Sequence, residues 1–304
     1  MHYALHEISK HDMSINKIII PSFICSELIP VFEHLKLKIE FYTINDDLTF
    51  EEDELESLLS KDKTFLLVIN YFGFPANWDM IAKLRKKFDF ITIEDNAHTL
   101  CSLHKNKKLG EFGDISFNSF RKMLPLLSGS ELIFNKHKPN NTYIHHSRFP
   151  TIGEIIYSLR SFKTKIFKKM IHVDTKTPPT NFNENKIDFI SNKILQNIDF
   201  NKNDIVNIRN RNYTFWENYL KDKNLTFFKN LKAKRDVCPY VFPCLAKSEN
   251  EKNNWINWGK EKNISIISWP DLPEMAIPFL KDKNLKNMLC FPVNHQFDLT
   301  KIIS

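Results

Sequence analysis

The 304-residue sequence is poor in glycine, in closely spaced cysteines and in long apolar runs. With six glycines it contains no glycine-rich phosphate-binding loop. Its five cysteines (Cys25, Cys101, Cys238, Cys244 and Cys290) are odd in number and far apart, which indicates neither a disulfide framework nor a zinc ribbon, and we expect no metal site. No stretch approaches the roughly 20 apolar residues of a membrane helix.

The first twenty residues carry charges and no continuous apolar segment, so no signal peptide is visible and we expect a cytoplasmic protein. A net charge of +7 favours anionic partners such as phosphates, nucleotides or a membrane surface. The lysines are scattered and no nucleic-acid motif accompanies them, so nucleic acid is not an expected partner. A basic amphipathic pattern at 151–172 is compatible with peripheral membrane contact, but a helix packed on the protein core is the favoured interpretation.

A composition of 42% apolar and 13% aromatic residues is sufficient for a packed core. Strand patterns alternate with amphipathic helices over the first 135 residues. The predicted strands are 17–21, 38–44, 65–72, 90–94, 114–120 and 131–135, and the predicted helices are 26–35, 49–59 and 77–88. Because these strands are nearly continuously apolar, the pattern predicts an α/β fold with a mostly parallel sheet sandwiched by helices.

The rest of the chain has a different pattern. Two helices are predicted at 187–198 and 203–221, followed by a strand at 240–246, a helix at 250–263 and a strand at 264–270. This order predicts a small α+β C-terminal domain. We therefore divide the chain into a large α/β domain, 1–180, and a small domain, 181–304.

Two acids, an amide and a histidine follow an apolar strand in "ITIEDNAHTL" (91–100). Burying a carboxylate costs several kcal/mol unless a cation or a hydrogen-bond donor meets it. Asp95 lies at the carboxyl end of its strand, where ligands of such sheets bind, and Lys122 follows a strand that ends at the same edge. An aspartate and a lysine on one rim suit pyridoxal phosphate, whose pyridine nitrogen pairs with the aspartate while the lysine binds covalently. The alternative is a structural ion pair of Asp95 with a lysine or arginine.

Several segments resemble the DegT/StrS family of fold type I, pyridoxal-phosphate-dependent sugar aminotransferases. They are "IIIPSFIC" (18–25), "VINYFGFPANWDMIAKL" (68–84), "IEDNAH" (93–98), "LGEFGDISFNSF" (109–120) and "RKMLPLLSG" (121–129). Further on, "RNRNYTFW", "CPYVFPCLA", "SWPDLP" and "FPVNHQFD" are similar to the C-terminal domain of one branch of that family.

The resemblance implies a role for each matching residue. Asp95 would bind the pyridine nitrogen, Lys122 would carry the cofactor, and Ala97 would pack on the ring face. His98 would lie near the ring's phenolic oxygen, although a helix-start histidine capped by the backbone is the alternative. Ser119 would help to hold the phosphate.

The resemblance further implies transamination of a nucleotide-linked keto-sugar for surface polysaccharide or lipopolysaccharide synthesis, including O-antigen, with glutamate as the amino donor. It also implies a homodimer in which Asn183, in the polar connection 175–185, reaches the partner's cofactor.

The sequence departs from the family pattern in four places. The phosphate-gripping turn expected near the N-terminus is missing, and Cys25 replaces an aromatic residue expected to stack on the ring. In addition, "SFRK" is shorter than the usual serine-to-lysine spacing, and the usual double glycine is reduced to Gly129-Ser130. These departures motivate a second hypothesis, in which the protein is a degenerate, non-catalytic family member that acts as a binding or scaffold protein in a polysaccharide pathway.

Overall fold

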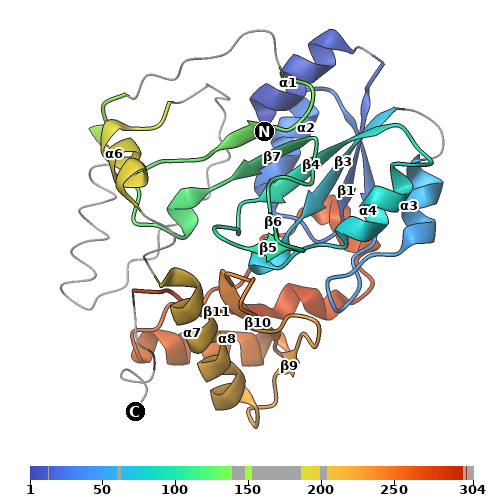
Figure 1. The fold of residues 1–304 in the computed structure, drawn as a ribbon. Coiled ribbons are helices and arrows are strands. Elements are labelled where there is room, and N and C mark those ends of the chain that lie inside the picture. The colour runs from blue at the N-terminus through green and yellow to red at the C-terminus, as the bar shows by residue number, and fades with distance from the viewer. Residues whose placement is uncertain are drawn as a thin grey trace.

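A mostly parallel sheet forms the larger part of the protein. The structure is a computed structural model and describes residues 1–12, 14–59, 63–138, 148–152, 186–198, 204–296 and 299. The sheet has six strands in the order β2-β1-β3-β4-β7-β8 (Figure 1). Their bounds are β1 Lys17–Pro21, β2 Lys38–Tyr42, β3 Thr64–Ile69, β4 Phe90–Asn96, β7 Ile115–Asn118 and β8 Leu132–Phe134. Neighbouring strands are parallel except β7 and β8, which are antiparallel, so the predicted sheet type is confirmed.

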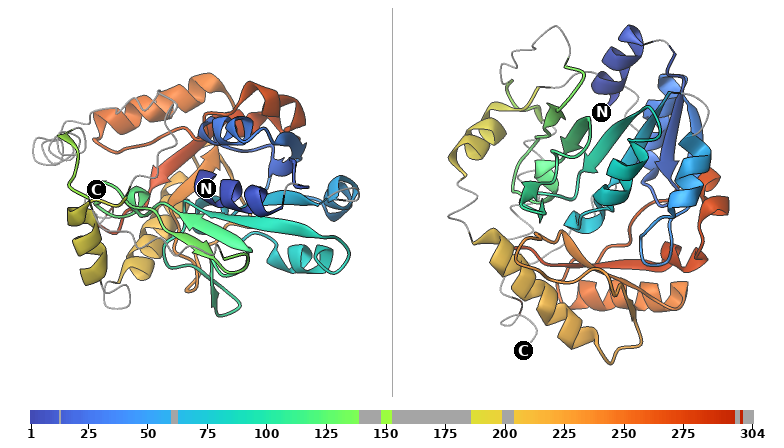
Figure 2. Two further views of the ribbon diagram at one scale, coloured as in Figure 1. Left: turned by 90° about the horizontal axis from the view of Figure 1, so that it is seen from above. Right: turned by 45° about the vertical axis from the view of Figure 1, so that its right-hand side comes forward.

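Helices cover both faces of this sheet (Figure 2). They are α1 His2–His11, α2 Ile29–His34, α3 Glu52–Leu59 and α4 Trp78–Leu84. Strands β1, β3 and β4 are buried along their whole length, which explains why apolar residues predominate in them without alternating with polar ones, apart from the polar end of β4. Local chemistry sets the helix starts: the Asn77 side chain accepts a hydrogen bond from the Met80 N–H at 3.1 Å and caps α4.

Two local features differ from the predictions. The helix expected at 26–35 is divided into the 3₁₀ turn η1 (Ser26–Leu28) and α2, because Pro30 is suited to the first turn of a helix. A short hairpin, β5 Leu103–His104 and β6 Lys107–Lys108, was not predicted. Its turn residues Lys105 and Asn106 have φ angles of 52° and 62°, the left-handed conformation that tight hairpin turns require.

A smaller antiparallel sheet, in the order β11-β10-β9, makes up most of the C-terminal part. Its strands are β9 Thr226–Phe227, β10 Val241–Leu245 and β11 Met288–Pro292, and helices α7 Ile205–Leu220 and α8 Glu249–Glu261 lie beside it (Figure 1). Helix α6, Phe189–Asn197, lies apart from this sheet, and its Ser191 hydroxyl accepts hydrogen bonds from the N–H groups of Leu127 and Ser128. The described residues also contain four short 3₁₀ turns, η2 (Tyr71–Gly73), η3 (Phe120–Lys122), η4 (Glu274–Phe279) and η5 (Lys283–Asn287).

The small sheet joins the larger sheet near the end of β3. The Tyr240 N–H donates to the Phe72 carbonyl at 2.8 Å, and the Cys238 N–H donates to Ser102 Oγ at 2.9 Å. Because both bonds lie beside the carboxyl ends of the parallel strands, the C-terminal part covers the edge where a ligand would bind.

The strand predicted at 264–270 is wrong. The Ile264 N–H bonds to the Gly259 carbonyl at 2.7 Å to close α8, and within this segment Ile267 makes an isolated bridge to Cys290. Strand β10 pairs instead with β11, which was not predicted as a strand.

Two other predictions fall on residues that the structure does not describe. The domain boundary at 180 and nearly all of the basic pattern 151–172 lie in 153–185, outside the described residues. Among the helices that are described, none combines the length and the apolar character needed to cross a bilayer.

Candidate active site

Strand alternation separates the two neighbouring acids of β4. Glu94 is fully buried and its carboxylate accepts backbone hydrogen bonds from Gly110 (2.6 Å), Phe112 (2.9 Å) and Gly113 (2.9 Å). The Asn70 side chain donates a further bond at 3.0 Å. Because successive strand residues point to opposite faces, Glu94 serves to fix the 110–113 loop while Asp95 faces the other way.

Asp95 is a buried carboxylate with little compensation. Its recorded hydrogen bond comes from the Ala97 N–H at 2.8 Å, and no cation of the described residues lies within ion-pair distance of it. Burial raises the pKa of Asp95, while the Ala97 hydrogen bond and the positive charge of Lys122 oppose that rise. The structural ion pair considered as the alternative is therefore not formed here, and the carboxylate retains the capacity to meet a cationic group.

Lys122 comes to the same rim from the end of β7. It closes the turn η3, where its N–H donates to the Ser119 carbonyl at 3.1 Å, and its Nζ lies 3.3 Å from His98 Nε2. The residue as a whole is exposed, but its amino end contacts the His98 ring in a partly buried position. Burial lowers the pKa of Lys122 although the negative charge of Asp95 opposes this. A lowered pKa increases the fraction of neutral amine, the form that attacks a carbonyl.

His98 lies in an aromatic cage. Its ring stacks between Phe72 (centroids 5.7 Å, planes 4° apart) and Tyr240 (4.6 Å, 10°), and Trp269 meets it edge-on at 4.8 Å. Burial lowers the pKa of His98 well below its usual value, and the charge of Lys122 adds to this, so the ring is neutral at physiological pH. Its Nδ1 is buried with no hydrogen-bond partner among the described residues, so the alternative of a backbone-capped histidine is not supported.

Phe72, Tyr240 and Trp269 were not predicted as site residues. They belong to "YFG", "CPYVFPC" and "SWP", which are present in the quoted motifs but carry no periodic signal of their own. The turn that presents Phe72 needs a glycine after it, because Gly73 has a φ of 88° and an added Cβ would lie 2.4 Å from the Cys238 carbonyl oxygen. This close contact between the two parts of the chain therefore depends on Gly73.

A buried arginine of α7 links the two sides of the site. Arg209 has no exposed surface and forms no ion pair with a carboxylate of the described residues. Its guanidinium donates to the carbonyls of Pro239 (3.0 Å), Tyr240 (3.2 Å) and Met123 (3.4 Å), and to Asn294 Oδ1 (3.3 Å). It thus connects the residue next to Lys122 with the residue whose ring covers His98, which the sequence reading missed.

The remaining predicted site residues are placed as follows. Ser119 is half-buried at the start of η3, and its hydroxyl makes no capping bond there. Ala97 is half-buried beside Asp95. Asn183 lies outside the described residues. No group of three or more histidine, cysteine or acidic side chains suited to a metal ion occurs in the part of the chain that the structure describes.

Comparison with known proteins places this site in a family. Residues 2–130 match the sequence model of the DegT/DnrJ/EryC1/StrS aminotransferase family. This segment contains β1, β3, β4, β7 and η3, and with them Asp95, His98 and Lys122. Residues 2–130 belong to the DegT/DnrJ/EryC1/StrS aminotransferase family. Over these residues, the resemblance to this family that the sequence predicted is confirmed.

One similar curated relative is UDP-4-amino-4,6-dideoxy-N-acetyl-beta-L-altrosamine transaminase of Campylobacter jejuni subsp. jejuni serotype O:23/36, strain 81-176. It is 35% identical over 92 residues, which are 29% of this chain and 24% of the relative. The chain's match thus spans about a quarter of that relative's length.

Solved structures support the fold over nearly the whole chain. PseC of Helicobacter pylori, an aminotransferase involved in the biosynthesis of pseudoaminic acid, aligns with a TM-score of 0.68 at 16% identity. The PLP form of the sugar aminotransferase Spr1654 of Streptococcus pneumoniae, described as putative, aligns with a TM-score of 0.67 at 14% identity. Each alignment covers 99% of this chain and 82% of the other. The predicted fold type I architecture is confirmed.

The residues at this rim fit pyridoxal phosphate. Asp95, a buried carboxylate with no cation of the described residues within ion-pair distance, suits a protonated pyridine nitrogen, and Lys122, an amine of lowered pKa, suits covalent attachment. The unpartnered Nδ1 of His98 leaves a hydrogen-bonding position open at the same rim.

Proposed function

We propose that this protein is a pyridoxal-phosphate-dependent aminotransferase that acts on a nucleotide-linked keto-sugar in surface polysaccharide biosynthesis. The observation that carries the proposal is the meeting of Asp95, His98 and Lys122 at the carboxyl ends of β4 and β7, with the Lys122 amine 3.3 Å from the His98 ring. The family of residues 2–130 and the name of the Campylobacter jejuni relative support the reaction type and the substrate class.

Each of the three residues has a separate task in this proposal. When bound, pyridoxal phosphate supplies an electron sink that stabilises negative charge at the reacting carbon. Asp95 holds the ring nitrogen in its protonated form because a buried carboxylate favours a neighbouring cation. Lys122 anchors the cofactor and, once released, carries a proton at Nζ. Neutral His98 orients the Lys122 amine and donates or accepts one hydrogen bond toward the ring.

Further parts of the proposal concern partners. Glutamate is the proposed amino donor, and the net charge of +7 suits a diphosphate-bearing substrate. We also propose a cytoplasmic homodimer in which Asn183 contacts the partner's cofactor, with Ser119 and Ala97 completing the cofactor site. A two-fold dimer is the commonest arrangement of soluble oligomers. Sedimentation at micromolar concentration tests the dimer, and a monomer that still transaminates would exclude it.

Covalent labelling tests the assignment of Lys122. Borohydride reduction of the protein with pyridoxal phosphate should leave a pyridoxyl group on the peptide containing residues 121–123, and Lys122→Ala should abolish both labelling and transamination. Lys107→Ala is the matched control, since the exposed Lys107 lies in β6, outside the site, and should leave labelling unchanged.

The same experiment separates this proposal from a non-catalytic scaffold. A colourless protein that takes up no pyridoxal phosphate on titration would favour the scaffold, and label on a lysine other than Lys122 would overturn the site.

A further inference from the structure

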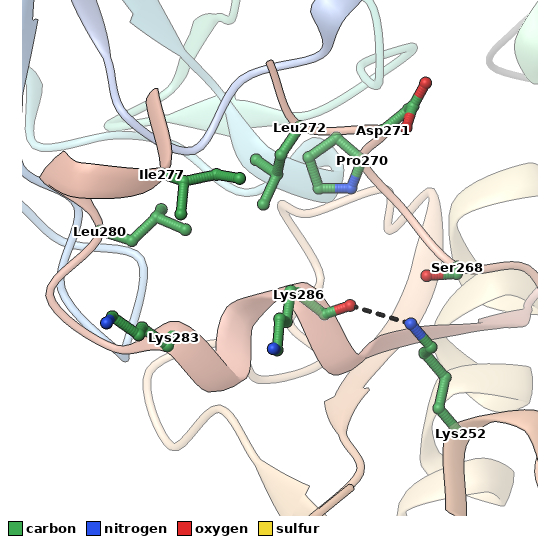
Figure 3. Close-up of a pocket in the computed structure, with 9 residues that line it drawn as sticks. All are labelled: Lys252, Ser268, Pro270, Asp271, Leu272, Ile277, Leu280, Lys283 and Lys286. Atoms are coloured by element: carbon green, nitrogen blue, oxygen red, sulfur yellow. Dashed lines mark hydrogen bonds between the residues drawn. The ribbon is translucent and has the colours of Figure 1, made fainter. Parts of the chain in front are cut away.

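A cavity of about 350 Å³ lies within the C-terminal part, and its lining residues fall between Lys252 and Lys286. One side of it is aliphatic and is formed by Pro270, Leu272, Ile277 and Leu280, while the opposite side carries lysines (Figure 3). The lysines are Lys252 of α8 and Lys283 and Lys286 of η5, and Ser268 and Asp271 complete the lining.

The cations of this cavity are not neutralised. None of the three lysines forms an ion pair with a carboxylate of the described residues. Lys252, which is half-buried, donates from Nζ to the Lys286 carbonyl at 3.2 Å. Asp271 is the one acid of the lining, and its carboxylate points away from the lysines (Figure 3). Three unpaired positive charges on one hollow attract an anion of more than one charge.

The lining of the cavity includes the sequence neighbours of Trp269 but none of the cofactor-binding residues. Its wall starts at Pro270, next to Trp269, whose ring meets His98 edge-on at 4.8 Å. The wall ends at Leu280, which forms an isolated β-bridge with Ile44, just beyond β2. Strand β2 is at the edge of the large sheet, three strands away from β4 and four from β7, which precedes Lys122. Asp95, His98 and Lys122 are not among the lining residues.

We propose that this cavity binds an organic diphosphate. Its phosphoryl oxygens contact Lys252, Lys283 and Lys286, and its organic part lies on the aliphatic wall. Long lysine stems with compact ammonium groups suit phosphate as point charges, and Ser268 offers one hydroxyl donor. The diphosphate has two sources: a free nucleoside diphosphate, or the nucleotide part of a nucleotide-linked sugar, and the second source alone rests on the proposed function.

Direct calorimetric binding to the full chain, without pyridoxal phosphate, tests the site. The probes are inorganic pyrophosphate, UDP and GDP. The double variant Lys283→Gln with Lys286→Gln should weaken binding of each probe about 10-fold, since two partly exposed charge contacts are lost. The control Lys229→Gln with Lys234→Gln removes the same charge from exposed positions outside the cavity and should change affinity less than about 2-fold. Equal losses in both double variants, or no binding to the unaltered chain at millimolar probe, would overturn the proposal.

Two further measurements locate the ligand. Ile277→Ser should weaken UDP and GDP but leave pyrophosphate unchanged, because Ile277 belongs to the aliphatic wall and is 43% exposed, so its replacement does not disturb the core. Pyridoxal phosphate should not displace pyrophosphate, and Lys122→Ala should bind pyrophosphate as the unaltered chain does. Displacement by pyridoxal phosphate would place the anion in the cofactor site and refute this cavity, whatever the fate of the proposed transamination.

The same design distinguishes the two sources. If the UDP- or GDP-linked sugar binds no more tightly than the free nucleoside diphosphate and the double lysine variant leaves its turnover unchanged, the site takes free diphosphates. If the double variant raises KM for the sugar nucleotide without changing kcat, the cavity holds the substrate's nucleotide part.

Discussion

Replacing Arg209 with methionine should destabilise the whole protein and not only the helix that carries it. Methionine keeps most of the buried apolar volume but removes every donor. The carbonyls of Pro239 and Tyr240, bonded at 3.0 and 3.2 Å, then lose a partner in the interior. The bonds to Met123 and Asn294, at 3.4 and 3.3 Å, are longer and contribute less.

The magnitude follows from these contacts. A buried acceptor left without its partner costs about 1–3 kcal/mol, so two well-made bonds account for about 2–6 kcal/mol. Burial lowers the pKa of Arg209, because holding a charged guanidinium in the interior costs desolvation free energy. Methionine carries no charge and avoids that cost, which offsets part of the free energy lost with the hydrogen bonds. We expect a net loss of about 3 kcal/mol, a large share of the roughly 5–15 kcal/mol by which domains are stable.

Urea unfolding followed by tryptophan fluorescence measures this loss. With a denaturant slope of about 3 kcal/mol/M, the midpoint should fall by about 1 M. The control is Arg211→Met, an exposed arginine of the same helix, which should shift the free energy of unfolding by less than about 0.5 kcal/mol. Since Arg209 also donates hydrogen bonds to the carbonyls of Met123 and Tyr240, Arg209→Met should slow pyridoxyl labelling of Lys122, which precedes Met123. Equal midpoints for the two variants would refute the reasoning.

Three further predictions concern the end of β4. Asp95→Asn should lower kcat by about 100-fold or more with a modest loss of cofactor affinity, and near-normal turnover would mean that the carboxylate is structural. Glu94→Gln should reduce the free energy of unfolding by about 2–4 kcal/mol, because an amide cannot accept all the hydrogen bonds that the carboxylate accepts. The control Glu33→Gln, at an exposed position, should leave the midpoint of the same urea titration unchanged. His98 has a lowered pKa in the folded state, so the unfolded chain takes up its proton first as pH falls. The difference in free energy of unfolding between the unaltered protein and His98→Phe should therefore decrease as the pH falls from about 7.5 to about 5. A difference that stays constant over this range would contradict a buried neutral ring.

Much of the fold could be predicted from local patterns. Residues buried on both faces of β1, β3 and β4 leave an unbroken apolar signature, and the helices between them leave an amphipathic one. Polar residues directly after such strands mark the ligand-binding edge, which is why Asp95 and Lys122 could be predicted from the pattern, whereas His98 was predicted from the family resemblance. Strand bounds near β11 could not be predicted, because "MLCFP" and "ISIISWP" have similar composition and only pairing with β10 distinguishes them.

The neighbours of these residues were decided by tertiary structure alone. The aromatic cage joins Phe72, Tyr240 and Trp269, which come from three distant segments, and Arg209 reaches the site from α7. Strand alternation was readable in the sequence, yet the backbone donors at 110–113 that satisfy Glu94 were not. The physical reason is that periodicity records which side of an element faces solvent, whereas a contact between elements depends on how their buried faces pack, and that packing leaves no repeating signal in the chain.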